Sequence, residues 1–168
     1  MFYLSINTFI IFAVIVIIIC LLYILYIYTF FPILRKNKIK KSIKELALSN
    51  NKSIEISKSN NKKVDFVIKT TKNIYNVKVV FIPDDCDLQI NNIDTWYSYN
   101  QSSYKQVVVS STFMKDESIE NRIVILGRKA KHIKKVINES EMIMVDDNTD
   151  VYGVHIINFK HYEFFLDN

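Results

Sequence analysis

Residue types that commonly do chemistry are present in this chain, but few of them stand at a spacing that chemistry requires. The three histidines are His132, His155 and His161. They lack the spacing of zinc ligands, both among themselves and relative to Cys86. The other cysteine, Cys20, lies in an uncharged N-terminal stretch. No disulfide framework is therefore expected, and this cysteine usage is typical of a reducing compartment.

Sites that depend on glycine are also excluded. The 168 residues hold two glycines, Gly127 and Gly153. A Walker phosphate loop, a dinucleotide-binding fingerprint and a nucleophile elbow each need several glycines at fixed spacing, so these three kinds of enzyme site cannot form. The acidic run at 146–150 reads DDNTD, but it lacks the glycine and the distal glutamate of a calcium loop.

Two β-branched and aromatic runs carry three polar residues of interest. Residues 64–70 and 74–82 are predicted to pair as a hairpin through a short polar turn. Asp65 lies in the first run, and Asn76 and Lys78 lie in the second. Because side chains alternate along a strand, Asn76 and Lys78 are expected to face the same way.

This order of elements resembles the restriction-endonuclease-like fold of the PD-(D/E)XK nucleases, especially the nuclease-related domains of bacterial membrane-anchored proteins. The resemblance covers residues 36–145 and includes a third short strand and a later helix–strand unit. Asp65 matches the first acid and Lys78 the lysine, while Asn76 stands where the second acid belongs. The resemblance implies that Asp65 and Lys78 are the candidate catalytic residues.

The amide of Asn76 departs from the family pattern. In the family, paired acids hold a divalent metal and the lysine positions or activates water, so an amide removes one formal charge from a hard-cation site. The resemblance then implies a degenerate domain with no metal and no cofactor, and Mg²⁺ is expected only if the chain is an enzyme. The alternative interpretation makes Asp65 a polar residue at a strand edge and Lys78 a solvated lysine.

The first 34 residues contain no charged side chain. Residues 10–31 read IIFAVIVIIICLLYILYIYTFF, which as a helix is ~33 Å long and can cross a hydrocarbon core of ~30 Å. A cleaved signal peptide is disfavoured because no basic residue precedes the apolar run. Residues 1–9 are predicted to lie outside the cell (inner) membrane, with a single pass at 10–31 and a cytoplasmic C-terminal domain.

A basic group follows the uncharged stretch and supports that orientation. Its first members are Arg35, Lys36, Lys38, Lys40 and Lys41. Such a group is attracted to anionic lipid head groups by ~1 kcal/mol per residue, unless it only sets the topology. Residues 32–63 are interpreted as a juxtamembrane helix and linker, with an apolar stripe at Ile39, Ile43, Leu46 and Ala47 on a helix over 36–48.

Residues 64–168 are predicted to form one mixed-sheet domain of the α/β or α+β class. A strand at 87–91 is expected to continue the hairpin as a meander. Residues 122–126, 128–138 and 141–145 are predicted to form a strand, an amphipathic helix and a strand parallel to the first. A final strand is expected at 154–159, and residues 92–120 give no clear pattern apart from a short candidate strand at 107–109.

A second basic group lies on the predicted helix. Arg128, Lys131 and Lys135 share one face if 128–138 is helical. Nucleic-acid phosphate, the inner leaflet and simple solvation are the three interpretations. Solvation is favoured because residues 64–168 carry a net charge of −3.

Two classes of function remain. The favoured one is a non-catalytic interaction or scaffold module at the membrane, whose partners are the bilayer, its anionic head groups and an unknown protein. The alternative is a membrane-tethered, metal-dependent, nuclease-like enzyme that acts on nucleic acid.

Overall fold

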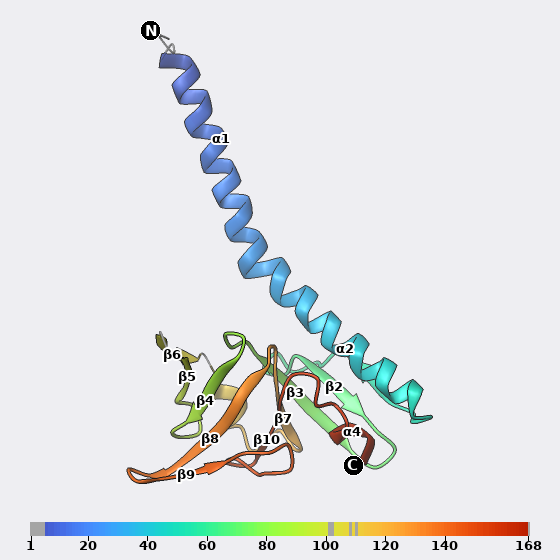
Figure 1. The fold of residues 1–168 in the computed structure, drawn as a ribbon. Coiled ribbons are helices and arrows are strands. Elements are labelled where there is room, and N and C mark those ends of the chain that lie inside the picture. Colours follow the sequence, from blue (N-terminus) through green and yellow to red (C-terminus); the bar gives the residue numbers. More distant parts are fainter. Residues whose placement is uncertain (1–5, 101–102, 108, 110, 168) are drawn as a thin grey trace. The chain divides into compact units, whose positions relative to one another are not determined.

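The computed structural model describes residues 6–100, 103–107, 109 and 111–167, and the chain divides into two compact units between Lys38 and Ile39. The first unit is helical: α1 (Ile6–Leu25) runs into a π-helical segment, η1 (Tyr26–Phe30), and then into α2 (Phe31–Ser49) (Figure 1). The large apolar side chains of α1 from Phe9 onward are exposed. By length and composition this stretch contains a helix that can cross a membrane.

The π-helical segment lies directly before Pro32. Its C-terminal neighbour Phe31 donates its N–H to the carbonyl of Tyr26, five residues back. Proline has no N–H to donate and crowds the carbonyl four residues before it, so a wider turn relieves the conflict without breaking the helix.

The second unit begins with the remainder of α2. Ile39, Ile43 and Ala47 are buried, four residues apart, as the predicted apolar stripe requires. The helix ends at Ser49, Asn51 in the following turn has a left-handed φ of 53°, and Lys52 N donates to the Ala47 carbonyl at 2.9 Å. This bond closes the C-terminus in the manner of a Schellman cap.

The first sheet has the strand order β1-β2-β3-β7-β10. Its strands are β1 (Glu55–Ser57), β2 (Phe66–Lys69), β3 (Ile74–Val80), β7 (Arg122–Leu126) and β10 (Val154–Ile157). β1, β2 and β3 are antiparallel neighbours, which confirms the predicted hairpin, whereas β3, β7 and β10 run parallel.

The second sheet has the order β6-β5-β4-β8-β9. Its strands are β4 (Cys86–Ile90), β5 (Trp96–Asn100), β6 (Ser103–Val107), β8 (Ala130–Asn138) and β9 (Glu141–Met144). The expected meander is wrong, because β4 leaves the first sheet after the Pro83 turn and pairs with β5 and β8. The segment without a clear pattern holds β5, β6 and the short helix α3 (Ser111–Met114).

The predicted helix at 128–138 is also wrong, because these residues form β8. Ala130 lies opposite Cys86 and Ile133 opposite Leu88, so three steps of β8 match two of β4 across a β-bulge. The bulge buries two apolar residues three apart, and this spacing imitates the period of a helix. The predicted parallel pairing is wrong too: β7 pairs with β3 and β10, and β9 is antiparallel to β8.

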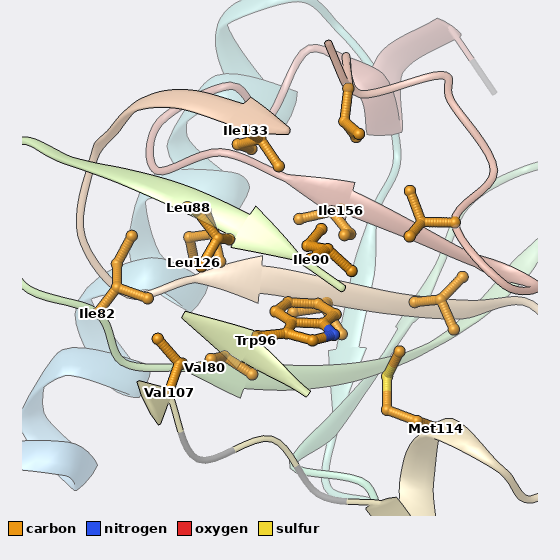
Figure 2. Packing of buried hydrophobic residues seen from close by; sticks show 14 of the residues in the cluster. Val80, Ile82, Leu88, Ile90, Trp96, Val107, Met114, Leu126, Ile133 and Ile156 are labelled. Atoms are coloured by element: carbon orange, nitrogen blue, oxygen red, sulfur yellow. The ribbon is translucent and has the colours of Figure 1, made fainter. Parts of the chain in front are cut away.

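Two apolar clusters hold the second unit together. One lies between the sheets and includes Trp96, Leu88 and Ile133 from the second sheet, with Leu126 and Ile156 from the first (Figure 2). The other covers the outer face of the first sheet and is formed by α2, by strand residues and by the C-terminal helix α4 (Phe164–Asp167). The architecture is therefore α+β, with two mixed sheets in place of the one expected.

Candidate functional site

The candidate catalytic residues Asp65 and Lys78 lie close together, Asp65 directly before β2 and Lys78 in β3. Asp65 Oδ1 lies 3.6 Å from Lys78 Nζ, and the two side chains are 11% and 21% exposed. Asp65 immediately precedes β2, and its backbone N–H donates to the Val77 carbonyl at 2.8 Å. Its other carboxylate oxygen, Oδ2, accepts the Val79 N–H at 2.9 Å. The carboxylate therefore accepts a backbone N–H of β3 beyond the start of β2, where β2 itself offers no carbonyl to that N–H.

Asn76 faces the same side of β3 as Lys78, and its amide has a structural bond. Asn76 Nδ2 donates to the Glu120 carbonyl at 2.8 Å, and Asn76 N donates to the Asn121 carbonyl at 3.0 Å. These bonds join β3 to the segment that leads into β7. In the described parts of the chain, no three side chains of histidine, cysteine, aspartate or glutamate gather to hold a metal ion.

The second basic group does not form the predicted face, because its helix is a strand. Lys135 Nζ lies 4.3 Å from the centre of the Tyr152 ring, and Lys131 is exposed on the bulge. Arg128 precedes the strand and is half-buried. A shared helical stripe of Arg128, Lys131 and Lys135 therefore does not exist.

Asp87 of β4 instead gathers two basic side chains of β8. Its Oδ1 lies 2.8 Å from His132 Nδ1, and its Oδ2 accepts from Lys134 Nζ at 3.1 Å. Partial burial tends to raise the pKa of Asp87, but the hydrogen bonds from His132 and Lys134 outweigh it and leave the pKa lowered. The three residues fasten β4 to β8 where the bulge interrupts the ladder.

Asp147 shows the opposite effect. Burial raises the pKa of its carboxyl, although the Asn158 N–H, donated at 3.3 Å, and the nearby His161 act against the rise. His161 Nδ1 lies 3.3 Å from Asp147 Oδ2. This carboxylate holds the loop after β9 against the end of β10.

The first basic group lies on α2, on both sides of the boundary between the two units. In the first unit, the Arg35 guanidinium lies 5.1 Å from the centre of the Phe31 ring, and Lys38 is exposed. In the second unit, Lys40 Nζ lies 5.0 Å from the centre of the Phe66 ring, and Lys41 is exposed beside Glu45. Lys38 keeps its charge available to a surface, whereas Lys41 forms an exposed ion pair with Glu45 at 3.7 Å.

Sequence reasoning missed an exposed apolar edge formed by β9. All four residues of this strand are exposed, with Met142 at 53%, Ile143 at 38% and Met144 at 59%. β9 pairs with β8 on one side and ends the sheet on the other (Figure 1). The apolar run at 141–145 is the available signal, but its pattern alone predicts a strand parallel to 122–126 and not an exposed edge.

The register shows which backbone groups of β9 face outward. Val145 N donates to the Ile133 carbonyl, and hydrogen-bonded pairs alternate along an antiparallel ladder. Ile143 and Lys135 are therefore the next hydrogen-bonded pair. The N–H and C=O groups of Met142 and Met144 point away from β8, toward the open edge.

Of the elements behind the nuclease resemblance, the structure contains the hairpin formed by β2 and β3, with Asp65 close to Lys78. The helix expected in the later helix–strand unit is β8. Comparisons of the chain with protein-family models, with curated proteins and with solved structures find no match.

Proposed function

We propose that this protein is a membrane-anchored interaction module: its N-terminal helix crosses the membrane, and its second unit binds an extended segment of a partner protein along the edge of β9. The anchor is supported by the exposed apolar side chains of α1. Each such side chain gains roughly 1.5–3 kcal/mol on leaving water, so a bilayer is the solvent that this surface requires.

The orientation of the anchor follows from charge. No basic residue lies in the 34 residues before Arg35, whereas exposed Lys38, Lys41 and Lys44 follow. Positive charge is retained on the cytoplasmic side, where anionic head groups also attract it. The second unit is accordingly cytoplasmic, at the inner face of the cell membrane.

The topology can be tested with a C-terminal tag. External protease added to spheroplasts should leave a tag fused after Asn168 intact until detergent opens the membrane. Digestion of the tag from outside would contradict the orientation.

The observation that carries the interaction function is the exposure of β9. Edge strands are usually protected by lysine, proline or cover, because their free backbone groups recruit other strands. The edge strand β6 contains Lys105, and the edge strand β1 consists of Glu55, Ile56 and Ser57. β9 also has a charged residue, Glu141, at its start, but its other three residues, Met142, Ile143 and Met144, are exposed and apolar, and methionine adapts well to varied partners.

An extended segment of a partner protein fits this edge better than a second copy of the chain. A strand of four residues spans ~13 Å, and pairing two such strands buries far less than the ~1,200 Å² of a stable interface. A partner segment can add its own strand to the open backbone groups and continue over neighbouring surface.

Photo-crosslinking in living cells tests this surface. A benzophenone amino acid at Met142 should give light-dependent adducts of one or a few defined masses, identified by mass spectrometry. The same group at Lys105, on the other edge of the sheet, is the matched control and should not give them. Equal adducts from both positions, or none from Met142, would overturn the proposal, and adducts of twice the chain mass would replace the partner with a second copy.

A further inference from the structure

A polar cavity of about 440 Å³ opens on the second unit. The parallel strands β3 and β7 begin beside it, and β10 contributes His155, its second residue. Its polar lining consists of Asn73, Asn121, Arg122, Asn148, Asp150 and His155. Tyr75 and Phe164 add two aromatic rings, whose centres lie 5.8 Å apart.

Arg122 brings a positive charge to this cavity. Its Nη1 donates to the Met114 carbonyl and, at 3.5 Å, to the Asp116 carbonyl. Carbonyls fix the guanidinium without neutralising it, and among the described residues no carboxylate forms an ion pair with Arg122. Gly153 makes room for it, since a Cβ added there would lie 2.9 Å from Arg122 Nη2, and the φ of Gly153 is +76°.

Asp150 brings a negative charge to the same cavity. Its Oδ1 accepts the Gly153 N–H at 2.8 Å, so the backbone also fixes this group. In the part of the chain that the structure describes, no basic side chain lies within ion-pair distance of Asp150. Two opposite charges thus line one cavity, and each is held by the backbone and left unpaired.

His155 adds a further unsatisfied group. It forms an isolated bridge with Asp150 and lines the cavity. Its Nδ1 is buried with no hydrogen-bond partner among the described residues. Buried polar atoms without partners are few in native proteins, and each calls for an explanation such as a functional role or a bound water or ion.

We propose that this cavity binds a small zwitterion of the amino-acid class, with its carboxylate on Arg122 and its ammonium group on Asp150. A simple anion would meet the carboxylate of Asp150, and a simple cation would meet the guanidinium of Arg122. A ligand with both charges satisfies both groups. The asparagine amides, which can donate and accept, are suited to the polar atoms of the ligand. This site is independent of the interaction edge on β9.

Thermal unfolding of the full chain in detergent micelles tests the proposal, with each of the twenty L-amino acids at 10 mM as probe. A ligand with a Kd near 1 mM should raise Tm by roughly 4 °C, because binding only to the folded state stabilises it. Acetate and methylammonium, alone and together, are the control probes and should give no comparable rise. If no amino acid raises Tm above these controls, the proposal is wrong.

Asp150→Asn is the decisive variant, because an asparagine oxygen can still accept the Gly153 N–H while the charge is lost. The unliganded Tm should stay close to that of the parent chain, and the rise with ligand should disappear. Asp84→Asn removes an exposed carboxylate elsewhere and should retain the rise. A ligand effect that survives in Asp150→Asn would overturn the assignment of the ammonium site.

Discussion

Asp65 accepts the Val79 N–H through one carboxylate oxygen, while its other oxygen lies 3.6 Å from Lys78 Nζ. One side chain therefore completes the β2–β3 ladder and neutralises a strand lysine. The hydrogen bond and the ion pair give Asp65 and Lys78 a structural role, at the position where the nuclease resemblance expects catalytic residues.

Substitutions should distinguish the stability contributed by the Asp65–Val79 hydrogen bond from that of the Asp65–Lys78 ion pair. Asp65→Ala leaves the Val79 N–H unsatisfied and should lower the free energy of unfolding by about 1–3 kcal/mol. Asp65→Asn keeps an acceptor and should cost less, and Lys78→Met should cost about 0.2–1 kcal/mol, as for other partly exposed ion pairs. Urea unfolding followed by the fluorescence of the single tryptophan measures all three; equal losses from Asp65→Ala and Asp65→Asn would contradict the ladder role.

Divalent metal distinguishes the interaction module from the nuclease-like alternative. We expect Mg²⁺ or Mn²⁺ at millimolar concentration to leave Tm unchanged, once ionic strength is matched with NaCl. The enzyme alternative predicts a rise of several degrees, because metal would bind the folded state alone. A rise that disappears in Asp65→Ala, together with cleavage of DNA or RNA, would establish the alternative.

The bulge in β8 gives a pair of matched substitutions. Ile133 is 4% exposed in the core between the sheets, so Ile133→Ala should lower the free energy of unfolding by about 2–5 kcal/mol. Ile137, on the same strand, is 49% exposed, and Ile137→Ala should change it by less than about 0.5 kcal/mol. Similar losses at both positions would contradict this register.

Acid should weaken the tie between Lys63 and Asp116. The hydrogen bond from Lys63 Nζ, 2.6 Å long, and that from Ser118 lower the pKa of Asp116 to about 2. Because the folded-state pKa lies below the ordinary 3.8, this stabilisation is present above pH 3.8 and is lost as pH falls toward 2. Asp116→Asn should reduce stability at pH 7 and flatten its decline below pH 4. An unchanged decline in this variant would contradict the assignment, and Asp84→Asn serves as the control.

Sequence patterns correctly predicted the elements that are determined by residues close together in the chain. The apolar stripe of Ile39, Ile43 and Ala47 specifies one helix face, and the two β-branched runs around a polar turn specify the β2–β3 hairpin. The same hairpin places Asp65 Oδ1 3.6 Å from Lys78 Nζ.

Features that depend on distant contacts could not be predicted in this way. The bulge opposite Cys86 and Leu88 gives β8 a helical spacing of apolar residues, although its parallel partner decides that it is a strand. β5 and β6 carry mixed aromatic and polar residues with no clean alternation. The cavity joins Arg122 to Asp150 across 28 positions of the chain, and the exposure of β9 follows from its place at the sheet edge.

The most direct test of the interaction surface is a proline at Met142. The N–H of Met142 faces the open edge, so Met142→Pro should leave the β8–β9 ladder and the Tm intact while blocking strand addition. With the benzophenone probe moved to Met144, partner adducts should fall at least tenfold in Met142→Pro and persist in Met142→Leu. Adducts that persist at the parental level in a normally folded Met142→Pro chain would contradict binding along β9.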